Sequence, residues 1–463
     1  MSFDDVLAAT ALEQAHLIRT RQLSSEELTR ATLERIDARN GHLHAFVRVF
    51  HRRALRTAKA KDAMVKRGEP LPVFHGVPIG IKDLNFVRFS RTSMGSRGAL
   101  PLISPVDDKS AASARRGGFV FVGKTATSEV GAMPVTEPDI HEATANPWNP
   151  LHTAGGSSGG AAASVAGGLL SIAHGSDGGG SIRLPSGFCH LFGHKPSRGR
   201  VPNAFGAPDK EILYTCGPLA QSVADAAAFL DVLAGLDIGR PHWAPPPARR
   251  YLDGLAPPSR PLRIRFTTVT PLGPTDPEVA AAVVRTAKLL ADQGHHVEEG
   301  TMPSATLEEF LPVWQRLISG VPLIRWSRAQ PITKWLREVG ARLDPEQVLK
   351  TRRELERRFL TAFDEVDVWL TPTSPTPAPR IGAFTGDKSP EQGFAEAAVL
   401  GSFTAIFNVT GQPAASVPSG LSSRGLPMGV QVAGKPFADD VVLSVSRQLE
   451  ELMPWRQRRA PLA

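Results

Sequence analysis

Residues 153–187 read TAGGSSGGAAASVAGGLLSIAHGSDGGGSIRLPSG. Eleven of these 35 residues are glycine and seven are serine, a composition that is typical of a flexible linker. Two apolar runs, 161–165 and 169–173, lie between the glycines, and a linker has no need of them. The stretch therefore raises three alternatives: slack chain, a loop that cradles a phosphate, and a catalytic site.

The glycine pattern does not fit either of the common phosphate-binding loops. A Walker loop needs a lysine directly after its last glycine, and no lysine follows these glycines. A dinucleotide-binding fingerprint needs glycines at i, i+2 and i+5, but Gly178 and Gly180 are followed by Arg183. We therefore exclude the phosphate cradle.

The segment 158–170 argues against a linker, because it is almost all Gly, Ala, Val and Leu and carries no charge. A helix rimmed by glycines can approach a neighbouring backbone closely, although each internal glycine costs up to about 1 kcal/mol. A sequence that tolerates such a cost is usually buried. We predict a buried central helix with Ser157 and Ser158 at its N-terminus and a second glycine turn, 178–181, beyond its end.

The second glycine turn carries the stronger chemical signal. In S-D-G-G-G-S-I-R (176–183), three glycines precede Ser181. Glycines allow successive N–H groups to turn toward one point and form an anion-binding nest. A nest beside a serine hydroxyl is the arrangement that acyl transfer requires. A tight turn with an incidental serine is the structural alternative.

Short apolar runs along the chain predict strands. The run V-P-I-G-I-K-D (77–83) ends in two charged residues, so it predicts a buried strand that delivers Lys82 and Asp83 to its carboxyl end. Further strands are expected at 119–124, 262–268, 366–373, 413–420 and 429–434. The Pro-rich stretches 241–261 and 371–379 are expected to be surface excursions.

Helical patterns separate these runs. The clearest covers 276–294, with Asp276 as the expected N-cap and Gly294 as the stop. The first forty residues also read as helix, with a capping box at 24–27. Strands that alternate with helices predict an α/β fold in which helices cover both faces of the sheet.

Composition and charge narrow the class of protein. The chain has 463 residues, of which 41% are hydrophobic and 21% charged, as in an ordinary soluble globular protein. The net charge is +8 but the basic residues are dispersed, so we expect no nucleic-acid partner. No apolar segment reaches the roughly 18 residues that span a bilayer, so we expect no membrane association. The acidic start of the chain is unlike a signal peptide, which predicts a cytoplasmic protein.

Cys189 and Cys216 lack metal-ligand spacing and are expected to be buried free thiols.

Nine blocks, in order over roughly residues 70 to 435, resemble the amidase signature family of serine hydrolases. They are GVPIGIKD (76–83), FVGKT (121–125), NPWNP (146–150), GGSSGGAAASVAGG (155–168), GSDGGGSIRLPSGFC (175–189), GHKPSRGRV (193–201), GPLAQSVAD (217–225), LTPTSPTPAP (370–379) and FNVTGQPAASVP (407–418). The resemblance implies an α/β/α sandwich with a large, twisted, mixed central sheet. It implies one amidase domain over 1–463, with a signature core at about 70–240 and a variable helical pocket region at about 300–360.

Matched block by block, the resemblance implies a Ser–Ser–Lys triad. Ser181 falls at the nucleophile, Ser157 at the bridging serine that follows a cis peptide bond, and Lys82 at the terminal base. A lysine serves as a base only when neutral, so Lys82 must lie in a dry site that lowers its pKa well below ~10.4. The implied oxyanion hole consists of the backbone N–H groups of Gly178, Gly179, Gly180 and Ser181.

The remaining site residues are expected to support or shape the pocket. Ser158 is expected to cap the helix or pack, and Asp177 and Arg183 to form a structural pair near the nucleophile turn. Met133 is expected at the pocket, whose walls should come from 126–145 and 300–345. The chain departs from the family's usual residues at Ser176, Gly178, Ala126 to Ser128 and His194, which affects the shape of the pocket and not the triad.

The expected activity is hydrolysis of a small-molecule carboxylic amide, aryl amide, carbamate or urea, with no cofactor or metal. The alternative is the glutaminase component of an amidotransferase, which releases ammonia from glutamine for a partner that acts on charged tRNA. That role requires charged pocket residues, whereas 400–412 is apolar. A non-catalytic binding protein is a third alternative, against which the intact triad and nest argue. A homodimer is compatible with the sequence, and the apolar and aromatic residues of 300–345 hint at an apolar acyl group.

Overall fold

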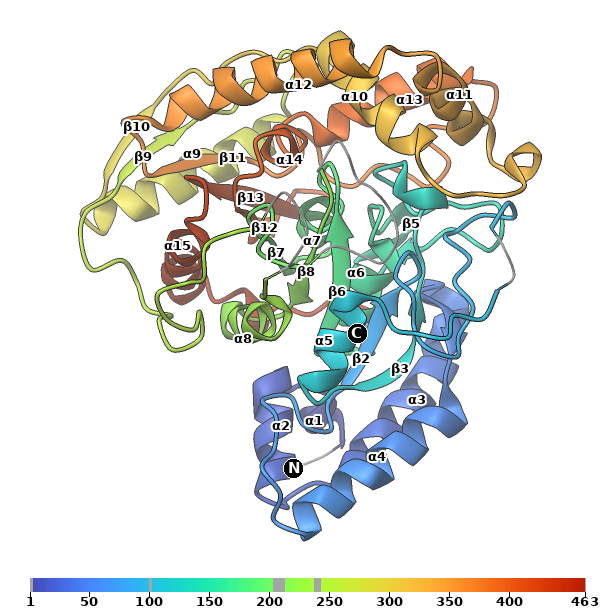
Figure 1. Cartoon of the computed structure of the whole chain (residues 1–463). Helices are drawn as coiled ribbons and strands as arrows, with labels where there is room; N and C mark the ends of the chain where they lie inside the picture. The colour runs from blue at the N-terminus through green and yellow to red at the C-terminus, as the bar shows by residue number, and fades with distance from the viewer. Residues whose placement is uncertain (1–2, 100–101, 203–212, 237–242, 463) are drawn as a thin grey trace.

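One large mixed sheet runs through the chain in the computed structural model, which describes residues 3–99, 102–202, 213–236 and 243–462 (Figure 1). Its eleven strands lie in the order β1-β3-β2-β6-β8-β7-β12-β13-β11-β9-β10. Their bounds are β1 Phe46–Val49, β2 Pro78–Lys82, β3 Val120–Thr125, β6 Ile172–Asp177, β7 Phe192–Lys195, β8 Thr215–Ala220, β9 Arg263–Phe266, β10 His296–Glu299, β11 Val368–Pro372, β12 Ala414–Leu421 and β13 Pro427–Gly434. A separate hairpin pairs β4 (Ala145–Asn146) with β5 (Asn149–Thr153).

Strand directions divide β3 to β10 of the sheet order into three parts, while β1 pairs antiparallel with β3 at one edge. Strands β3, β2 and β6 are mutually parallel, as are β11, β9 and β10. Between these groups, β6, β8, β7, β12, β13 and β11 are joined by antiparallel pairs. The strands β2, β3, β6 and β11 are buried on both faces, which explains why most of them read as continuous apolar runs in the sequence.

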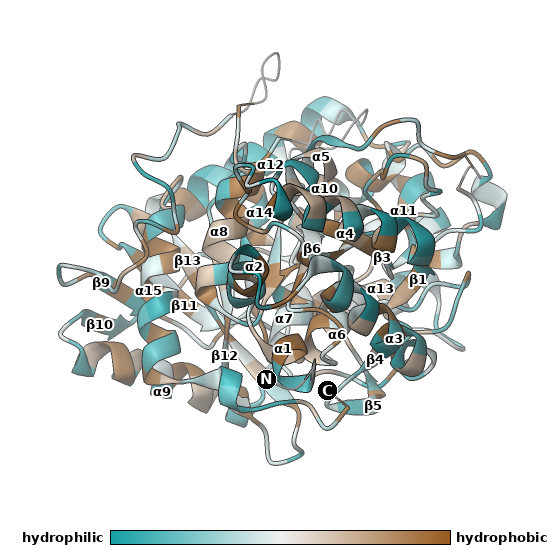
Figure 2. Cartoon of the chain, turned by 90° about the horizontal axis from the view of Figure 1, so that it is seen from below, coloured by the Kyte–Doolittle hydropathy of each residue, from teal (hydrophilic) through white to brown (hydrophobic). Residues whose placement is uncertain are grey.

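Helices cover both faces of the sheet, as predicted. Phe119 and Phe121 enter the core shared with α2, α5, α8, α9 and α15, whereas Val120 and Val122 enter the core shared with α3, α4 and α6. A third core, around Trp369, holds α10, α11, α12 and α14. Figure 2 shows that α6 and α8 are largely hydrophobic, as expected for helices buried against the sheet.

The helices have the following bounds: α1 Phe3–Ala8, α2 Ala11–Arg19, α3 Ser25–Leu43, α4 His51–Lys66, α5 Lys109–Arg116, α6 Gly159–Ala166, α7 Arg183–Phe188, α8 Val223–Leu233, α9 Pro277–Asp292, α10 Leu307–Ser319, α11 Pro331–Gly340, α12 Pro345–Leu360, α13 Pro390–Ala398, α14 Ile406–Val409 and α15 Asp439–Leu452. Short 3-10 turns include η1 Glu129–Gly131 and η4 Val399–Gly401. No helix in the described ranges combines the length and the apolar character that crossing a membrane requires.

The glycine-rich stretch 153–187 forms the centre of the fold. Every residue of α6 except Ala166 is buried, and α6 packs against β2, β3, β6 and β8. A Cβ on Gly160 would lie 2.3 Å from the backbone nitrogen of Ala126 and 2.4 Å from the carbonyl oxygen of Ala45, so only glycine permits this approach. The prediction of a buried, glycine-rimmed helix is confirmed.

Topology brings the ends of two strands to one edge. Because β2 and β6 are parallel neighbours, their carboxyl ends lie together, and these ends carry Lys82 and Asp177. The chain leaves β6 directly into the glycine turn 178–180 and then enters α7, while Ser157 and Ser158 precede α6 beside them. The sheet thus collects the residues predicted from sequence for the site at a single edge.

All six predicted strands are present, each end within two residues of the prediction, and the predicted helix 276–294 is α9 with Asp276 as its N-cap. Two expectations were incomplete or wrong. Strands β1, β6, β7, β8 and β10 of the large sheet were not predicted; in β6, small and polar side chains interrupt the apolar residues within the glycine-rich stretch. The Pro-rich segment 371–379 is not a surface excursion but is mostly buried, since it continues β11 into the interior. The described part of the other Pro-rich stretch, 243–261, is mostly exposed, while 241–242 lie outside the described residues.

Candidate active site

Lys82 is a buried lysine without an acidic partner. Its side chain is 0% exposed, and its Nζ donates hydrogen bonds to Ser157 Oγ and Ser158 Oγ, each at 2.7 Å, and to Ser176 O at 3.3 Å. No carboxylate in the described part of the chain lies within ion-pair distance of this nitrogen. Burial lowers the pKa of Lys82 to about 7, although the negative charge of Asp177 opposes this effect. A substantial share of Lys82 is therefore a neutral amine near pH 7.

Two adjacent serines receive the Lys82 hydrogen bonds. The peptide bond between Gly156 and Ser157 is cis, as the resemblance implied, and Ser157 is 2% exposed. Ser158 occupies the N-cap position of α6, but its hydroxyl makes no capping hydrogen bond. Instead, Ser158 Oγ accepts from Lys82 and donates to Ser176 O at 3.1 Å, so the expected capping role is wrong. Ser158 holds the lysine in place.

The glycine turn presents backbone donors next to Ser181. The N–H groups of Gly178, Gly179 and Ser181 have no hydrogen-bond partner among the described residues. The Gly180 N–H donates to Asp177 Oδ1 at 2.7 Å, so its hydrogen points into the turn. Of the four donors expected from the sequence, Gly180 is therefore already engaged. Gly180 also has a φ of +133°, a conformation that L side chains rarely adopt.

Asp177 and Arg183 form the expected structural pair behind the turn. Both side chains are 0% exposed, and Arg183 Nη2 lies 2.8 Å from Asp177 Oδ1. Burial alone would raise the pKa of Asp177, but the charge and hydrogen bonds of Arg183 outweigh it and hold that pKa well below its usual range. Arg183 also donates to Thr404 O, Gln431 Oε1 and Asn408 Oδ1. The pair thus fixes the glycine turn to the C-terminal half of the chain.

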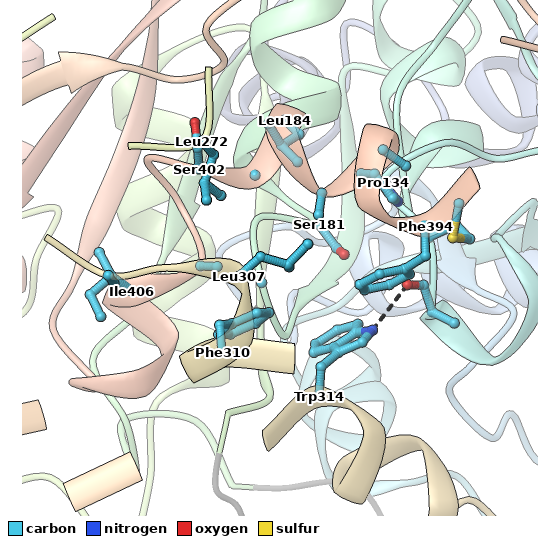
Figure 3. A pocket seen from close by; sticks show the side chains of 18 of the residues that line it. Pro134, Ser181, Leu184, Leu272, Leu307, Phe310, Trp314, Phe394, Ser402 and Ile406 are labelled. Atoms are coloured by element: carbon cyan, nitrogen blue, oxygen red, sulfur yellow. Dashed lines mark hydrogen bonds between the residues drawn. The ribbon is translucent and has the colours of Figure 1, made fainter. Parts of the chain in front are cut away.

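Of Lys82, Ser157 and Ser181, only Ser181 lines a cavity. It lines a cavity of about 780 Å³, its mouth included, and Figure 3 shows its hydroxyl among the side chains that surround this space. Ser158 N donates to Ser181 O at 3.2 Å, which ties the two serine segments together. No hydrogen bond joins the hydroxyls of Ser157 and Ser181, both of which lie in the described part of the chain. Catalytic hydrogen bonds of this kind often tighten only when substrate is bound.

Segments from both expected walls line the cavity. Met133 lies on one side, and α10 contributes three side chains from successive turns. The ring of Trp314 packs over the glycine turn, since a Cβ on Gly178 or Gly179 would meet it at 3.4 to 3.5 Å. Its indole Nε1 donates to Ala132 O at 3.2 Å, as the dashed line in Figure 3 shows. Trp314 therefore braces the turn against the segment that carries Met133.

A third wall, which was not predicted from the sequence, consists of residues from 394–406 together with Leu272. Phe394 comes from α13, and Ile406 begins α14. The sequence marked 400–412 only as apolar, and this uncharged character is the local signal that could have pointed to the third wall.

The cysteines are buried free thiols, as predicted. Burial raises the pKa of Cys189 far above its usual range and that of Cys216 to about 11. Because the thiolate is the reactive form of cysteine, neither residue is poised as a nucleophile.

Comparisons with known proteins show which family the chain is similar to. A family model described as Amidase matches residues 27–318 and 328–443. The chain is 33% identical over 489 residues to the 6-aminohexanoate-cyclic-dimer hydrolase of Paenarthrobacter ureafaciens, covering 98% of this chain and 96% of that protein. A solved structure of a 6-aminohexanoate cyclic dimer hydrolase with substrate superimposes with a TM-score of 0.91 at 29% identity, covering 98% of this chain and 99% of that one. A bacterial aryl acylamidase structure gives a TM-score of 0.86 at 27% identity, with 97% of each chain covered.

An amidotransferase component is a more distant structural neighbour. The solved A component of the glutamyl-tRNA(Gln) amidotransferase from Thermotoga maritima superimposes with a TM-score of 0.77 at 26% identity, covering 98% of this chain and 96% of that one.

Proposed function

Because the chain belongs to the amidase signature family and is a hydrolase of amide C–N bonds, we propose that it forms an acyl-enzyme on Ser181. In this proposal Lys82 is the base, Ser157 relays the proton, and the N–H groups of Gly178, Gly179 and Ser181 hold the oxyanion. The substrate is a small carboxylic amide, with aryl amides, carbamates and ureas as related candidates.

The proposed reaction begins with proton transfer along the relay. Neutral Lys82 takes the Ser157 proton while Ser157 takes the Ser181 proton, and Ser181 Oγ forms a bond to the amide carbonyl carbon. The carbonyl electron pair moves onto oxygen, where the free N–H donors stabilise it; losing one such donor typically costs about 3–4 kcal/mol in the barrier. When the tetrahedral intermediate collapses, the C–N bond breaks and Ser157 returns the proton to the leaving nitrogen. Lys82 then reprotonates Ser157.

Water completes the proposed cycle through the same groups. It loses a proton to the relay, attacks the acyl carbonyl and releases the carboxylic acid from Ser181. Each proton taken up by Lys82 is returned, to the amine in the first half and to Ser181 in the second. The cycle therefore consumes one water per amide and leaves the enzyme unchanged.

The observation that carries the proposal is the contrast between Lys82 and an ordinary buried lysine. Lys124, on the adjacent strand β3, is equally buried and makes a 2.8 Å ion pair with Asp83. Lys82 contacts only hydroxyls and a carbonyl, one of the hydroxyls being Ser157 at 2.7 Å. An unpaired buried lysine is costly, and such groups concentrate at functional sites.

The amidotransferase alternative has less support. Glutamine carries an α-ammonium and an α-carboxylate, which need charged partners inside a pocket, and no described residue that lines the cavity is charged. We therefore expect the purified chain, without a partner, to hydrolyse simple amides. Turnover of glutamine only after a second protein is added would favour the alternative.

The test of the proposed function is a substrate panel. The purified chain and its Ser181→Ala variant are assayed with anilides, aliphatic amides, carbamates and ureas, and released amine is quantified. Wild-type turnover of at least one class, absent in Ser181→Ala, supports the proposal. Equal turnover by both proteins, or none by either across the panel, contradicts it, and the latter result favours a non-catalytic protein.

A further inference from the structure

The cavity beside Ser181 is walled by apolar groups. Leu307, Phe310 and Trp314 project from successive turns of α10, Phe394 comes from α13, and Met133 follows η1. Figure 3 shows the labelled members of this set gathered around the Ser181 hydroxyl. No side chain among the described residues that line the cavity carries a charge. We call this group of five side chains the apolar wall.

Charged groups close to the apolar wall form ion pairs with one another. Glu309, on the same helix, lies 2.8 Å from Arg358 and accepts the backbone N–H of Thr306 at 3.0 Å. The Glu309 carboxylate thus places negative charge in the first turn of α10, where helices favour it. Behind the glycine turn, Asp177 and Arg183 neutralise each other. The described residues that line the cavity therefore offer a charged substrate group no counterion.

The acyl group of the substrate occupies this cavity if Ser181 is the nucleophile. In an acyl-enzyme the acyl carbon is bonded to Ser181 Oγ, and Ser181 lines the cavity. The acyl group would therefore contact the apolar wall.

Resting on the proposed amidase function, we propose that the substrate is an amide with a neutral, apolar acyl group, and that an ammonium or carboxylate on that group is excluded. This class includes alkyl, cycloalkyl and aryl carboxamides and excludes amides of free amino acids. An unpaired charge brought into an apolar site loses its hydration without gaining a partner, and each buried methylene favours binding.

The first test compares matched anilides with the wild-type chain. One pair is the heptanoyl anilide and its isostere in which an ammonium replaces the terminal methyl; the other pairs a branched isopropyl end with a carboxylate of the same size. We expect kcat/KM to be at least about 100-fold higher for the neutral member of each pair. Lengthening the neutral acyl chain by one methylene should raise kcat/KM about fourfold until the cavity is full.

The second test changes the charge of the apolar wall. Leu307 is only partly buried, so Leu307→Glu places a carboxylate at the cavity with less risk of misfolding than a change at a fully buried position, and Leu307→Gln is its neutral control. The kcat/KM ratio of the ammonium anilide to the heptanoyl anilide should rise at least about tenfold in Leu307→Glu relative to Leu307→Gln.

The outcomes separate the two proposals. Hydrolysis of the charged anilides as fast as their neutral partners by the wild-type chain, whatever the variants do, overturns the neutral-acyl inference and leaves the amidase function standing. An unchanged ratio in folded Leu307→Glu places the acyl group outside this cavity and also overturns the inference. Failure to hydrolyse any neutral or charged amide overturns the proposed function itself, and with it the inference.

Discussion

Lys82 Nζ lies 2.7 Å from the hydroxyl oxygen of Ser157, seventy-five positions later in the chain. The contact forms because the parallel strands β2 and β6 end at the same edge of the sheet, next to the start of α6. On the neighbouring strand, Lys124 is buried to the same degree but is paired with Asp83. We therefore expect removal of Lys82 to affect activity and removal of Lys124 to affect stability.

Replacing Lys82 with methionine should abolish activity without harming the fold. The side chain keeps its approximate volume, while the base and the cost of a buried unpaired nitrogen are both removed. We expect kcat/KM to fall by at least about 1000-fold and the free energy of unfolding in urea to stay level or rise. Turnover within about tenfold of wild type would refute the relay.

Replacing Lys124 with methionine should do the reverse. Asp83 would keep its hydrogen bonds from Ser93 but lose its counterion in a buried site. We expect the free energy of unfolding to fall by about 3–5 kcal/mol. The folded fraction should retain a kcat/KM within about tenfold of wild type, because Lys124 does not contact the triad. A variant as stable as wild type would show that the ion pair is not structural.

The pH dependence of turnover should follow the ionisation of Lys82. Burial lowers the pKa of this lysine to about 7, and the protonated form cannot accept a proton from Ser157. Therefore kcat/KM should rise with pH through an apparent pKa of about 7 and then level off. A profile that is flat between about pH 5.5 and 9 would exclude a titrating base in this range.

The free energy of unfolding should also depend on the ionisation of Lys82, and it should increase with pH. An unfolded lysine has a pKa of ~10.4, so between about pH 7 and 10.4 the unfolded chain binds a proton at this position that the folded chain does not. The free energy of unfolding of wild type should therefore rise relative to Lys82→Met as pH increases through this window. Urea denaturation of both proteins at several pH values measures the difference, and a constant difference would contradict the lowered pKa.

Ser158 should act as a positioning residue for Lys82. Ser158→Ala removes one of the two hydroxyls that accept from the lysine, so we expect kcat/KM to fall by about 10- to 100-fold. The loss of an acceptor for the ammonium should also move the apparent pKa of kcat/KM downward. Ser164→Ala is the matched control, because Ser164 is buried in the same helix and its hydroxyl donates to Ala161 O. A purely structural role for Ser158 would leave the pH profile unmoved.

The pair of Asp177 and Arg183 should matter for both fold and turn geometry. Arg183→Met leaves the Asp177 carboxylate buried without its counterion, so we expect a loss of about 3–5 kcal/mol in the free energy of unfolding. Because the folded pKa of Asp177 is lowered, its contribution is present at neutral pH and is lost as pH falls below ~3.9. Equal stability of variant and wild type at neutral pH would contradict this role.

Much of the site could be predicted because its residues lie in local motifs. The glycine turn before Ser181 by itself indicates an anion-binding nest beside a serine. The order of the nine blocks linked this turn to Lys82 far upstream. The strand that delivers Lys82 was visible because it is a continuous apolar run, buried on both faces. These features depend on short stretches of sequence, which is why no structure was needed to find them.

Other features depend on long-range contacts and could not be predicted. The engagement of the Gly180 N–H by Asp177 depends on the backbone path through the turn. The hydrogen bond from Lys82 to Ser158 depends on how α6 meets β2, so the sequence favoured a capping role that is absent. The wall formed by Phe394 and its neighbours reaches Ser181 only through tertiary packing. The segment 371–379 is rich in proline, which is typical of surface loops, so its burial was not predicted.

The most direct test of the account is the site of covalent labelling by a fluorophosphonate probe, followed by intact-protein mass and peptide mapping. We expect wild type to gain one phosphonyl group, located on Ser181, with the labelling rate greatly reduced in Lys82→Met and no adduct in Ser181→Ala. An adduct that persists in Ser181→Ala, or that maps to another residue in wild type, would contradict the assignment of Ser181 as the nucleophile activated by Lys82.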